Sequence, residues 1–322
     1  MQIKSFRGFV LDRKSYAKEI VFEEISEYKN SENLLWLHFD YTKDDAIDWI
    51  TNRSEIEDVA VDALLADETR PRMIVLKDNL LLSLRGVNLD ADANPEDMKS
   101  IRLYISENLI ISTSKEMILS VEEIIDELKN GIGVKSSSQF LVELTYKMID
   151  RMDDTIEQIQ DRTDYLEENI IDMKSLEFRN EILKIRRESI VLKRYLSPQK
   201  EALIKLSNEK ISWIDEYQRV EIRETNDQLI RHIEELDTIR DKVILIQEEL
   251  RNRLSEDINK KMYMLAIISA TFLPLTFLTG LLGINVGGIP GSSNENAFLI
   301  FSVILLFVVV FQFLLFKRNK WI

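Results

Sequence analysis

The sequence predicts a membrane protein with an α+β domain of mixed, largely antiparallel sheet, a long stalk helix and two C-terminal transmembrane helices. Three observations predict this fold class. Two uncharged runs, Met262–Ile284 and Ala297–Phe316, lie together near the C-terminal end. A heptad-like helical pattern leads into the first of them, and short β-prone segments with turn signals precede it. Each uncharged run can cross about 30 Å of hydrocarbon at about 1.5 Å per residue.

The overall composition excludes several classes of function. Charged residues make up 30% of the chain, yet the apolar residues are concentrated in its last part. The net charge of −14 has the wrong sign for nucleic acid and suits a protein that attracts cations. With no cysteine, the chain forms no disulfide and has no thiol chemistry. Charged residues interrupt residues 1–15, which therefore do not resemble a signal peptide.

Residues 1–135 are expected to form a cytoplasmic α/β domain. The expected strands are Asn33–Tyr41, Met73–Leu76, Leu80–Val87, Ile101–Ile105 and Leu109–Thr113, the last four forming two hairpins. The expected helices are Asp44–Ile50, Ile56–Ala66 and Glu116–Lys129. The third helix is followed by Asn130-Gly131, a pair typical of helix C-termini.

Residues 136–261 are expected to form a cytoplasmic helical and stalk region. We expect one or two helices over Ser138–Ser197, with a break or kink at Pro198 because proline disrupts a helix interior. The sequence from Gln199 to Leu273 has no Pro or Gly and predicts one uninterrupted helix. It carries a heptad-like stripe of Ile222, Leu229, Leu236, Val243 and Leu250.

A helix from Trp213 to Leu282 would be about 100 Å long. It must pack against copies of itself or against the helices of Ser138–Ser197, and we expect an oligomer with a cytoplasmic stalk.

The transmembrane helices are assigned to residues 262–284 and 297–316, with an extracytoplasmic loop at 285–296 and a cytoplasmic tail at 317–322. Basic residues flank the pair of spans, at Lys260 and Lys261 before it and at Lys317, Arg318 and Lys320 after it. The loop between the spans has no Lys or Arg. By the positive-inside rule both termini are cytoplasmic, in a protein of the cell (inner) membrane surrounded by lipid bilayer. The alternative, two core helices of a soluble protein, rarely produces two such uncharged runs.

The end of the first span resembles a known family. Gly283-Ile284-Asn285 resembles the Gly-Met/Ile/Val-Asn signature of the CorA superfamily of divalent cation transporters. Its surroundings, FLPLTFLTGLLGINVGGIPG, are more similar to the ZntB branch, which is associated with zinc. The magnesium and cobalt branch typically has Tyr-Gly-Met-Asn, where this chain has Leu282 and Ile284 instead of Tyr and Met. Three further segments resemble the family's cytoplasmic part: WLHFDY, ETRPR and LKRYLSPQ.

The resemblance covers most of the chain and implies a CorA-like homopentamer. In it the stalk helix becomes the inner membrane helix that lines a pore, and the second spans form an outer ring. Gly283, Ile284 and Asn285 would then form the selectivity filter. The implied cargo is a divalent cation, Zn²⁺ above all, with no cofactor and no catalytic residues. The sequence has no phosphate-binding loop, so ATP is not an expected partner.

The chemistry of the filter can also be argued from its residues. A Gly before Asn285 lets the backbone leave helical geometry near the mouth of the pore. A ring of Asn amide oxygens can accept hydrogen bonds from the water around a hydrated ion without removing that water. The structural alternative is that Asn285 only caps the helix. The loop residues expected at the mouth are Gly287, Gly288, Pro290, Gly291 and Glu295, the last as an acidic ring or a solvated acid.

A helical stripe is expected to line the pore. Steps of three or four residues connect its members, Met262, Leu265, Ser269, Leu273 and Thr276. Its apolar side chains could form a hydrophobic gate. Alternatively, its Ser and Thr bond their own backbone and face a neighbouring helix.

Two further residues are candidates on the cytoplasmic side. Glu248 shares the phase of the stripe and could line a cation-attracting interior. The chain has only two histidines, so a closed zinc cage is not expected. His38 is expected to be structural, and His232 is a weak candidate for a regulatory metal site.

Three functions remain open at the level of the sequence. The first is passive, pentameric transport of Zn²⁺ and other divalent transition metals, with or without proton coupling. The second is a CorA-type Mg²⁺/Co²⁺ channel. The third, of a different class, is a membrane-anchored coiled-coil scaffold or sensor in which Asn285 is dispensable.

Overall fold

The computed structural model describes residues 6–12, 17–29, 31–88, 97–170, 176–284, 289, 291 and 294–319. It divides into two compact units, Met1–Ile246 and Gln247–Ile322. The first unit holds the sheet and most of the helices, and the second holds two helical segments. Helix α8 (Glu216–Gly283) contributes residues to both units.

The first unit is built on a seven-stranded sheet of order β2-β1-β3-β7-β6-β5-β4. Its strands are β1 (Phe6–Leu11), β2 (Ala17–Ile20), β3 (Leu34–Asp40), β4 (Arg72–Leu76), β5 (Asn79–Gly86), β6 (Lys99–Ile105) and β7 (Leu109–Ser114). The pair β3–β7 is parallel, and the other pairs are antiparallel. The predicted mixed, largely antiparallel sheet is confirmed.

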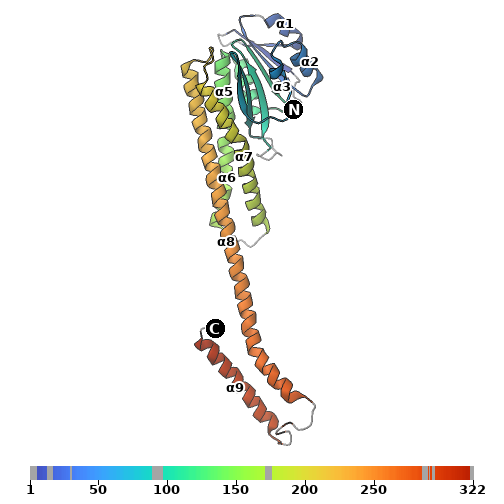
Figure 1. Cartoon of the computed structure of the whole chain (residues 1–322), viewed down its shortest axis with the longest axis vertical. Helices are drawn as coiled ribbons and strands as arrows, with labels where there is room; N and C mark the ends of the chain where they lie inside the picture. The colour runs from blue at the N-terminus through green and yellow to red at the C-terminus, as the bar shows by residue number, and fades with distance from the viewer. Residues whose placement is uncertain are drawn as a thin grey trace. The chain divides into compact units, whose positions relative to one another are not determined.

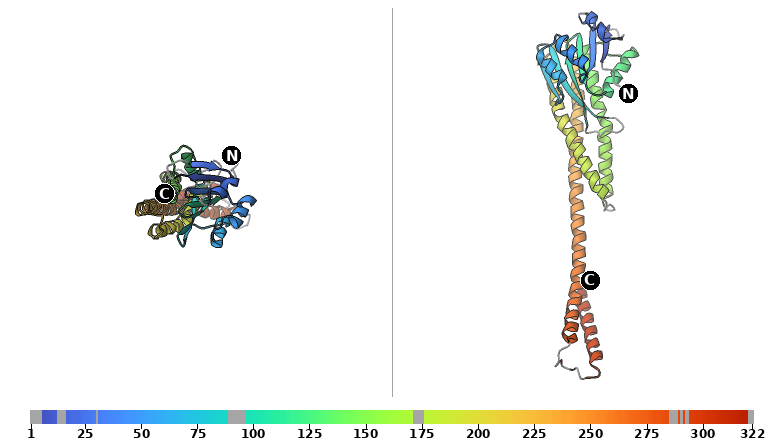
Figure 2. Two further views of the ribbon diagram at one scale, coloured as in Figure 1. Left: turned by 90° about the horizontal axis from the view of Figure 1, so that it is seen from above. Right: turned by 90° about the vertical axis from the view of Figure 1, so that its right-hand side faces the viewer.

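Helices cover both faces of the sheet (Figure 1, Figure 2). Alternation along β3 sends Leu35, Leu37 and Phe39 into a core shared with α2 (Asp44–Asn52) and α3 (Asp58–Leu65). Trp36 points to the other face, where its ring centroid lies 4.7 Å from that of Phe140. Every residue of β3 is buried, because β3 lies inside the sheet between β1 and β7 and is covered on both faces. Before it come the short helices η1 (Phe22–Glu24) and α1 (Ile25–Tyr28).

The predicted strands and short helices are confirmed with small changes of boundary. Both hairpins turn where expected, the first with Lys77 at a φ of 58°. Helix α4 runs over Leu119–Lys129, three residues shorter at its start than predicted. It ends as expected, because Gly131 adopts a φ of 74° and the amide of Ile132 bonds back to the carbonyl of Glu127.

Two strands, β1 and β2, were not predicted. Each is short, and neither shows a regular alternation of apolar and polar residues, since Arg7-Gly8 interrupts β1 and Lys18-Glu19 interrupts β2. Strand β1 is stabilised by pairing along its whole length with β3, from Phe6 opposite Phe39 to Leu11 opposite Leu34. The formation of β1 therefore depends on pairing with a strand that is distant in sequence, which the local pattern of residues does not show.

The predicted break at Pro198 is wrong, while the alternative of a kink there stays a prediction. After α5 (Ser137–Asp150) and α6 (Met152–Glu168), helix α7 runs over Leu176–Asn208 and continues through Pro198. A proline inside a helix costs about 3 kcal/mol. Packing on both sides of it offsets this cost, because Leu196 and Leu203 are fully buried. The side chain of Gln199 also accepts a hydrogen bond from the amide of Arg85, 2.8 Å away.

The predicted uninterrupted helix from Gln199 to Leu273 is also wrong. The chain turns between α7 and α8, after Asn208 and before Glu216. The turn between β4 and β5 holds this connection through Asp78. Its side-chain carboxylate accepts a hydrogen bond from the amide of Ser212 at 2.9 Å, and its backbone carbonyl accepts one from the indole of Trp213 at 2.8 Å. Asp215 and Gln218 then exchange backbone-to-side-chain bonds of 3.0 Å, which cap the start of α8.

The first part of α8 packs on helices of its own subunit. Ile222, Leu229, Leu236 and Val243 of the heptad-like stripe are buried. The amine of Lys242 lies 2.6 Å from a carboxylate oxygen of Asp164 on α6. The expectation that the stalk packs against the preceding helices is therefore confirmed up to Ile246, while the side chain of Leu250 is only half-buried.

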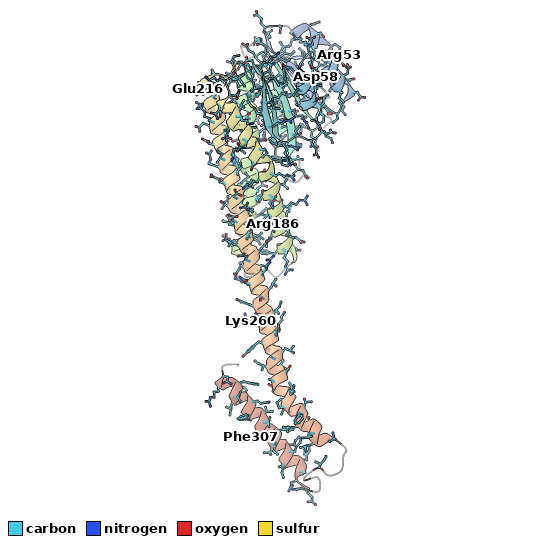
Figure 3. The ribbon with its side chains drawn as sticks, in the orientation of Figure 1. Arg53, Asp58, Arg186, Glu216, Lys260 and Phe307 are labelled. Carbon is cyan, nitrogen blue, oxygen red and sulfur yellow. The ribbon has the colours of Figure 1, made fainter. Side chains whose placement is uncertain are left out.

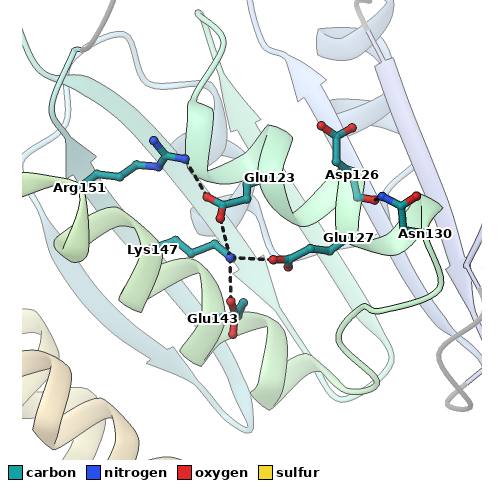
Figure 4. Close-up of polar contacts among 7 residues, drawn as sticks. All are labelled: Glu123, Asp126, Glu127, Asn130, Glu143, Lys147 and Arg151. Carbon is teal, nitrogen blue, oxygen red and sulfur yellow. Dashed lines mark hydrogen bonds and ion pairs between the residues drawn. The ribbon is translucent and has the colours of Figure 1, made fainter.

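A charged cluster joins α4 to α5 (Figure 4). The Lys147 amine contacts carboxylates of Glu123, Glu127 and Glu143 at 2.9 to 3.0 Å. Arg151 lies 2.7 Å from the other oxygen of Glu123. Burial alone would lower the pKa of Lys147, but hydrogen bonds to the three glutamates raise it above its usual value.

Candidate pore-lining helix

Two helices of the second unit are long and apolar enough to cross a membrane, α8 and α9 (Ala297–Arg318). None of the residues in the most apolar part of either helix is buried. Core helices of a soluble protein would bury these side chains, so the exposure favours lipid or further subunits as their surroundings. Figure 3 marks Lys260 at the charged end of the α8 span and Phe307 within the apolar run of α9.

One face of each helix contacts the other. On α8 the half-buried side chains of the span are Ile267, Thr271, Pro274, Leu275 and Leu278. On α9 the half-buried or buried ones are Ala297, Phe301, Leu305, Val308, Gln312 and Phe316. Both sets recur every three or four residues, as a helical packing stripe does. Figures 1 and 2 show α9 running alongside the C-terminal part of α8.

The predicted pore stripe lies on the opposite face of α8. At about 100° per residue, Met262, Leu265, Ser269, Leu273 and Thr276 centre about 180° from the side chains that face α9. All five are exposed, with Leu273 at 70%. The hairpin therefore leaves this face free for a central axis or for other subunits. Gly280 and Gly283 continue the same face, and a Cβ added to either would have no neighbour within 4 Å.

The predicted filter and loop are described only in part. Gly283 is the last residue of α8, and Ile284 follows it, exposed. Asn285, Gly287, Gly288 and Pro290 lie outside the described residues. Gly291 adopts a φ of +87°, which favours glycine, and its carbonyl accepts from the amide of Asn294 at 3.0 Å. Glu295 is exposed and lies two residues before α9 begins at Ala297.

The two candidates on the stalk part of α8, Glu248 and His232, are in different environments. Glu248 is exposed on α8. His232 is buried, with Nε2 3.2 Å from Asp153 on α6 and Nδ1 3.6 Å from Glu235. The two carboxylates lie at opposite ring nitrogens, so they and the ring do not converge on one ion. No group of three or more metal-ligating side chains with suitable geometry occurs among the described residues.

The other histidine is structural, as expected. His38 is buried in β3, with Nδ1 2.8 Å from the Ser112 hydroxyl and Nε2 3.3 Å from that of Ser114. Burial, with a smaller effect of the nearby Arg7, lowers the pKa of His38 to about 4.

Sequence reasoning assigned no role to one polar residue of the second span. Gln312 is the single polar side chain in the α9 stripe that faces α8, and its Nε2 donates to the Ala270 carbonyl at 3.3 Å. A lone amide in an apolar span is the signal that could have found it, because polar groups are costly in lipid unless they are bonded.

The sheet domain, the long helix and the pair of apolar helices together define the architecture of a two-span membrane protein. A model of the family described as "CorA-like Mg2+ transporter protein" matches residues 31–318. The chain therefore belongs to the CorA-like family of divalent cation transporters.

The relatives and solved structures are similar over nearly the whole chain. The divalent cation transporter CmaX of Pseudomonas aeruginosa is 35% identical over 318 residues, covering 98% of this chain and 96% of the relative. The zinc transport protein ZntB of Yersinia enterocolitica is 31% identical over 292 residues, covering 91% and 89%. The solved full-length CmaX structure aligns at a TM-score of 0.86 and 34% identity, over 99% of both chains.

Proposed function

We propose that this protein is a homopentameric channel-like transporter that moves hydrated Zn²⁺, and other divalent transition metals, across the cell (inner) membrane. Five copies of residues 262–284 surround the axis, and five copies of α9 form the outer ring. Both termini are cytoplasmic, and the loop 285–296 lies at the outer mouth. The selectivity filter is Gly283-Ile284-Asn285, and Thr276, Ser269 and the apolar members of the stripe line the pore below it.

One observation carries this proposal: the predicted pore stripe lies opposite the face of α8 that packs on α9. Two spans cannot enclose a pore by themselves, but copies of one span around an axis can. Such an assembly needs a free face on the inner helix, and the exposed stripe provides it. Ser269 and Thr276 supply hydroxyl groups for the water around an ion, and Leu265 and Leu273 supply a constriction that can close by dewetting.

The proposal of zinc rests on the filter and on the relatives. Ile284 replaces the Met of the magnesium signature, and a zinc transport protein is 31% identical to this chain. A filter of neutral Asn oxygens acts on a hydrated ion, so selectivity arises from the size and hydration of the ion and not from a cage of ligands. The strongly acidic chain, with a net charge of −14, favours cations near the protein.

Flux into proteoliposomes tests the proposal. Zn²⁺, Mg²⁺ and Co²⁺ uptake is measured with and without a pH gradient for the wild type, Asn285→Ala and Asn296→Ala. The last variant is a matched control, because Asn296 precedes α9, is exposed and makes no side-chain capping bond. We expect Zn²⁺ flux in the wild type and the control, and its loss in Asn285→Ala.

Three other outcomes decide between the alternatives. Mg²⁺ flux far above Zn²⁺ flux identifies a Mg²⁺/Co²⁺ channel. No flux of any ion supports the scaffold or sensor. Zn²⁺ flux that ignores the pH gradient excludes proton coupling.

A further inference from the structure

Helix α8 carries a proline in the middle of its membrane span, and this proline leaves one backbone carbonyl without its helical donor. In an α-helix the amide of residue i donates to the carbonyl of residue i−4. Pro274 has no amide hydrogen, so the carbonyl of Ala270 receives no helical bond from it. The proline ring also disfavours the usual position of that same carbonyl, because the two would clash.

The side chain of Gln312 bonds to this carbonyl. Its Nε2 lies 3.3 Å from the oxygen of Ala270, across the contact between α9 and α8. A carbonyl can only accept, so the amide must present its NH₂ group there, and the orientation of the side chain is settled by chemistry. The distance is at the long end of the usual range, which indicates a weak bond.

The surroundings explain why this bond matters. In lipid no water reaches the backbone, and a carbonyl freed by proline must be satisfied by a neighbouring helix or side chain. Two hydroxyls of the α8 span near Pro274 are engaged elsewhere: Thr271 donates to Ile267 and Thr279 to Leu275 within their own helix. Pro274 itself faces α9, in the same stripe as Thr271.

We infer that Gln312 is a positioning residue that replaces the helical donor missing at Pro274 and so fixes the direction of the pore helix on either side of the proline. The bond joins the outer helix to the inner helix between Ser269 and Leu273, two residues of the pore stripe. It sets the direction in which Thr276, the stripe residue that follows the proline, faces the axis. The inference rests on the proposed function only for its effect on flux, because the bond itself belongs to the hairpin.

A second polar atom of Gln312 supports a role beyond packing. Its Oε1 is buried and has no hydrogen-bond partner among the described residues. An amide that leaves one buried group unpaired is costly in an apolar helix. The cost is understandable if its other end serves the carbonyl freed by Pro274.

A double-mutant cycle in the full-length, lipid-reconstituted protein tests the inference. Pro274→Ala restores the missing amide donor, so Ala270 no longer needs Gln312. We expect Gln312→Leu to lower Zn²⁺ flux per assembled oligomer about threefold. This factor corresponds to the free energy of an average interhelical hydrogen bond in a membrane protein. The same change made in Pro274→Ala should have no effect. Ser302→Ala is the matched control, because the Ser302 hydroxyl bonds only to Phe298 of its own helix among the described contacts.

The melting temperature of the oligomer keeps the test independent of transport. It is measured in the four proteins of the cycle: the wild type, Gln312→Leu, Pro274→Ala and the double variant. We expect Gln312→Leu to lower it in the wild-type background and not in Pro274→Ala. If Pro274→Ala does not assemble, Gln312→Met, which keeps the length without a donor, should match Gln312→Leu. Equal losses in both backgrounds, or a Gln312→Met variant like the wild type, overturn the inference. If no ion is transported at all, the proposed function fails and the melting temperatures still decide the role of Gln312.

Discussion

The buried His38 predicts an acid-sensitive domain. Its pKa is about 4 in the folded protein and 6.5 when unfolded. The unfolded chain therefore binds more protons between these values, and stability falls as the pH falls. The contribution of the neutral ring is fully present above pH 6.5 and is lost progressively as the pH approaches 4. One pKa unit corresponds to about 1.4 kcal/mol, and the two pKa values differ by about 2.5 units. The neutral ring therefore contributes about 3 kcal/mol to the free energy of unfolding.

The assay compares the wild type with His38→Gln, which does not titrate in this range. Urea unfolding of the detergent-solubilised protein is followed by tryptophan fluorescence, since the ring centroid of Trp36 lies 6.5 Å from that of His38. The other acids titrate in both proteins and cancel in the difference. From pH 7.5 to 4.5 the wild type should lose about 2.5 kcal/mol more than the variant. A difference that does not change with pH, or that grows in the opposite direction, refutes the reasoning.

Two more predictions concern the contacts that hold the helices of the first unit. Lys147→Met leaves three glutamates without their shared amine. Because these glutamates are about one-third to two-fifths exposed, the free energy of unfolding should fall by about 1–2 kcal/mol, which is less than for a fully buried pair. Glu157→Gln, away from this cluster, serves as a control, and an unchanged urea midpoint in Lys147→Met contradicts the prediction. Asp78→Ala removes the acceptor of Ser212, so amide exchange in residues 209–215 should become several-fold faster, while exchange in β3 stays constant. Unchanged exchange in the α7–α8 connection would show that Asp78 does not hold it.

The membrane hairpin could be predicted from sequence because the bilayer requires one feature that a single sequence displays, an uncharged run of sufficient length. The helical period also groups Met262, Leu265, Ser269, Leu273 and Thr276 on one face of the span from sequence alone. Which side chains face α9 could not be assigned from sequence, because both sides of the span are largely apolar, and the structure supplies that face.

The errors have long-range causes. Strand β1 depends on its pairing with β3, and the end of α7 depends on Asp78, which lies 134 residues before Ser212. Helix α7 packs on β4 and β5, which lie far before it in sequence, and burial of Leu196 and Leu203 stabilises it through Pro198. Strand β1, the connection after α7 and α7 itself therefore all depend on partners that are distant in sequence. The cap formed by Asp215 and Gln218 was a local signal that could have placed the start of α8.

The accessibility of single cysteines in the span tests the central claim most directly. The chain has no cysteine of its own, so Ser269→Cys, Thr276→Cys and Thr271→Cys each introduce one thiol. Thr271 faces α9 and lies about 160° around the helix from Ser269. If the stripe lines a water-filled pore, a water-soluble thiol reagent should modify positions 269 and 276 at least about tenfold faster than position 271, because a thiol reacts as the solvated thiolate. Equal rates, or faster modification at position 271, would contradict the assignment of the pore face.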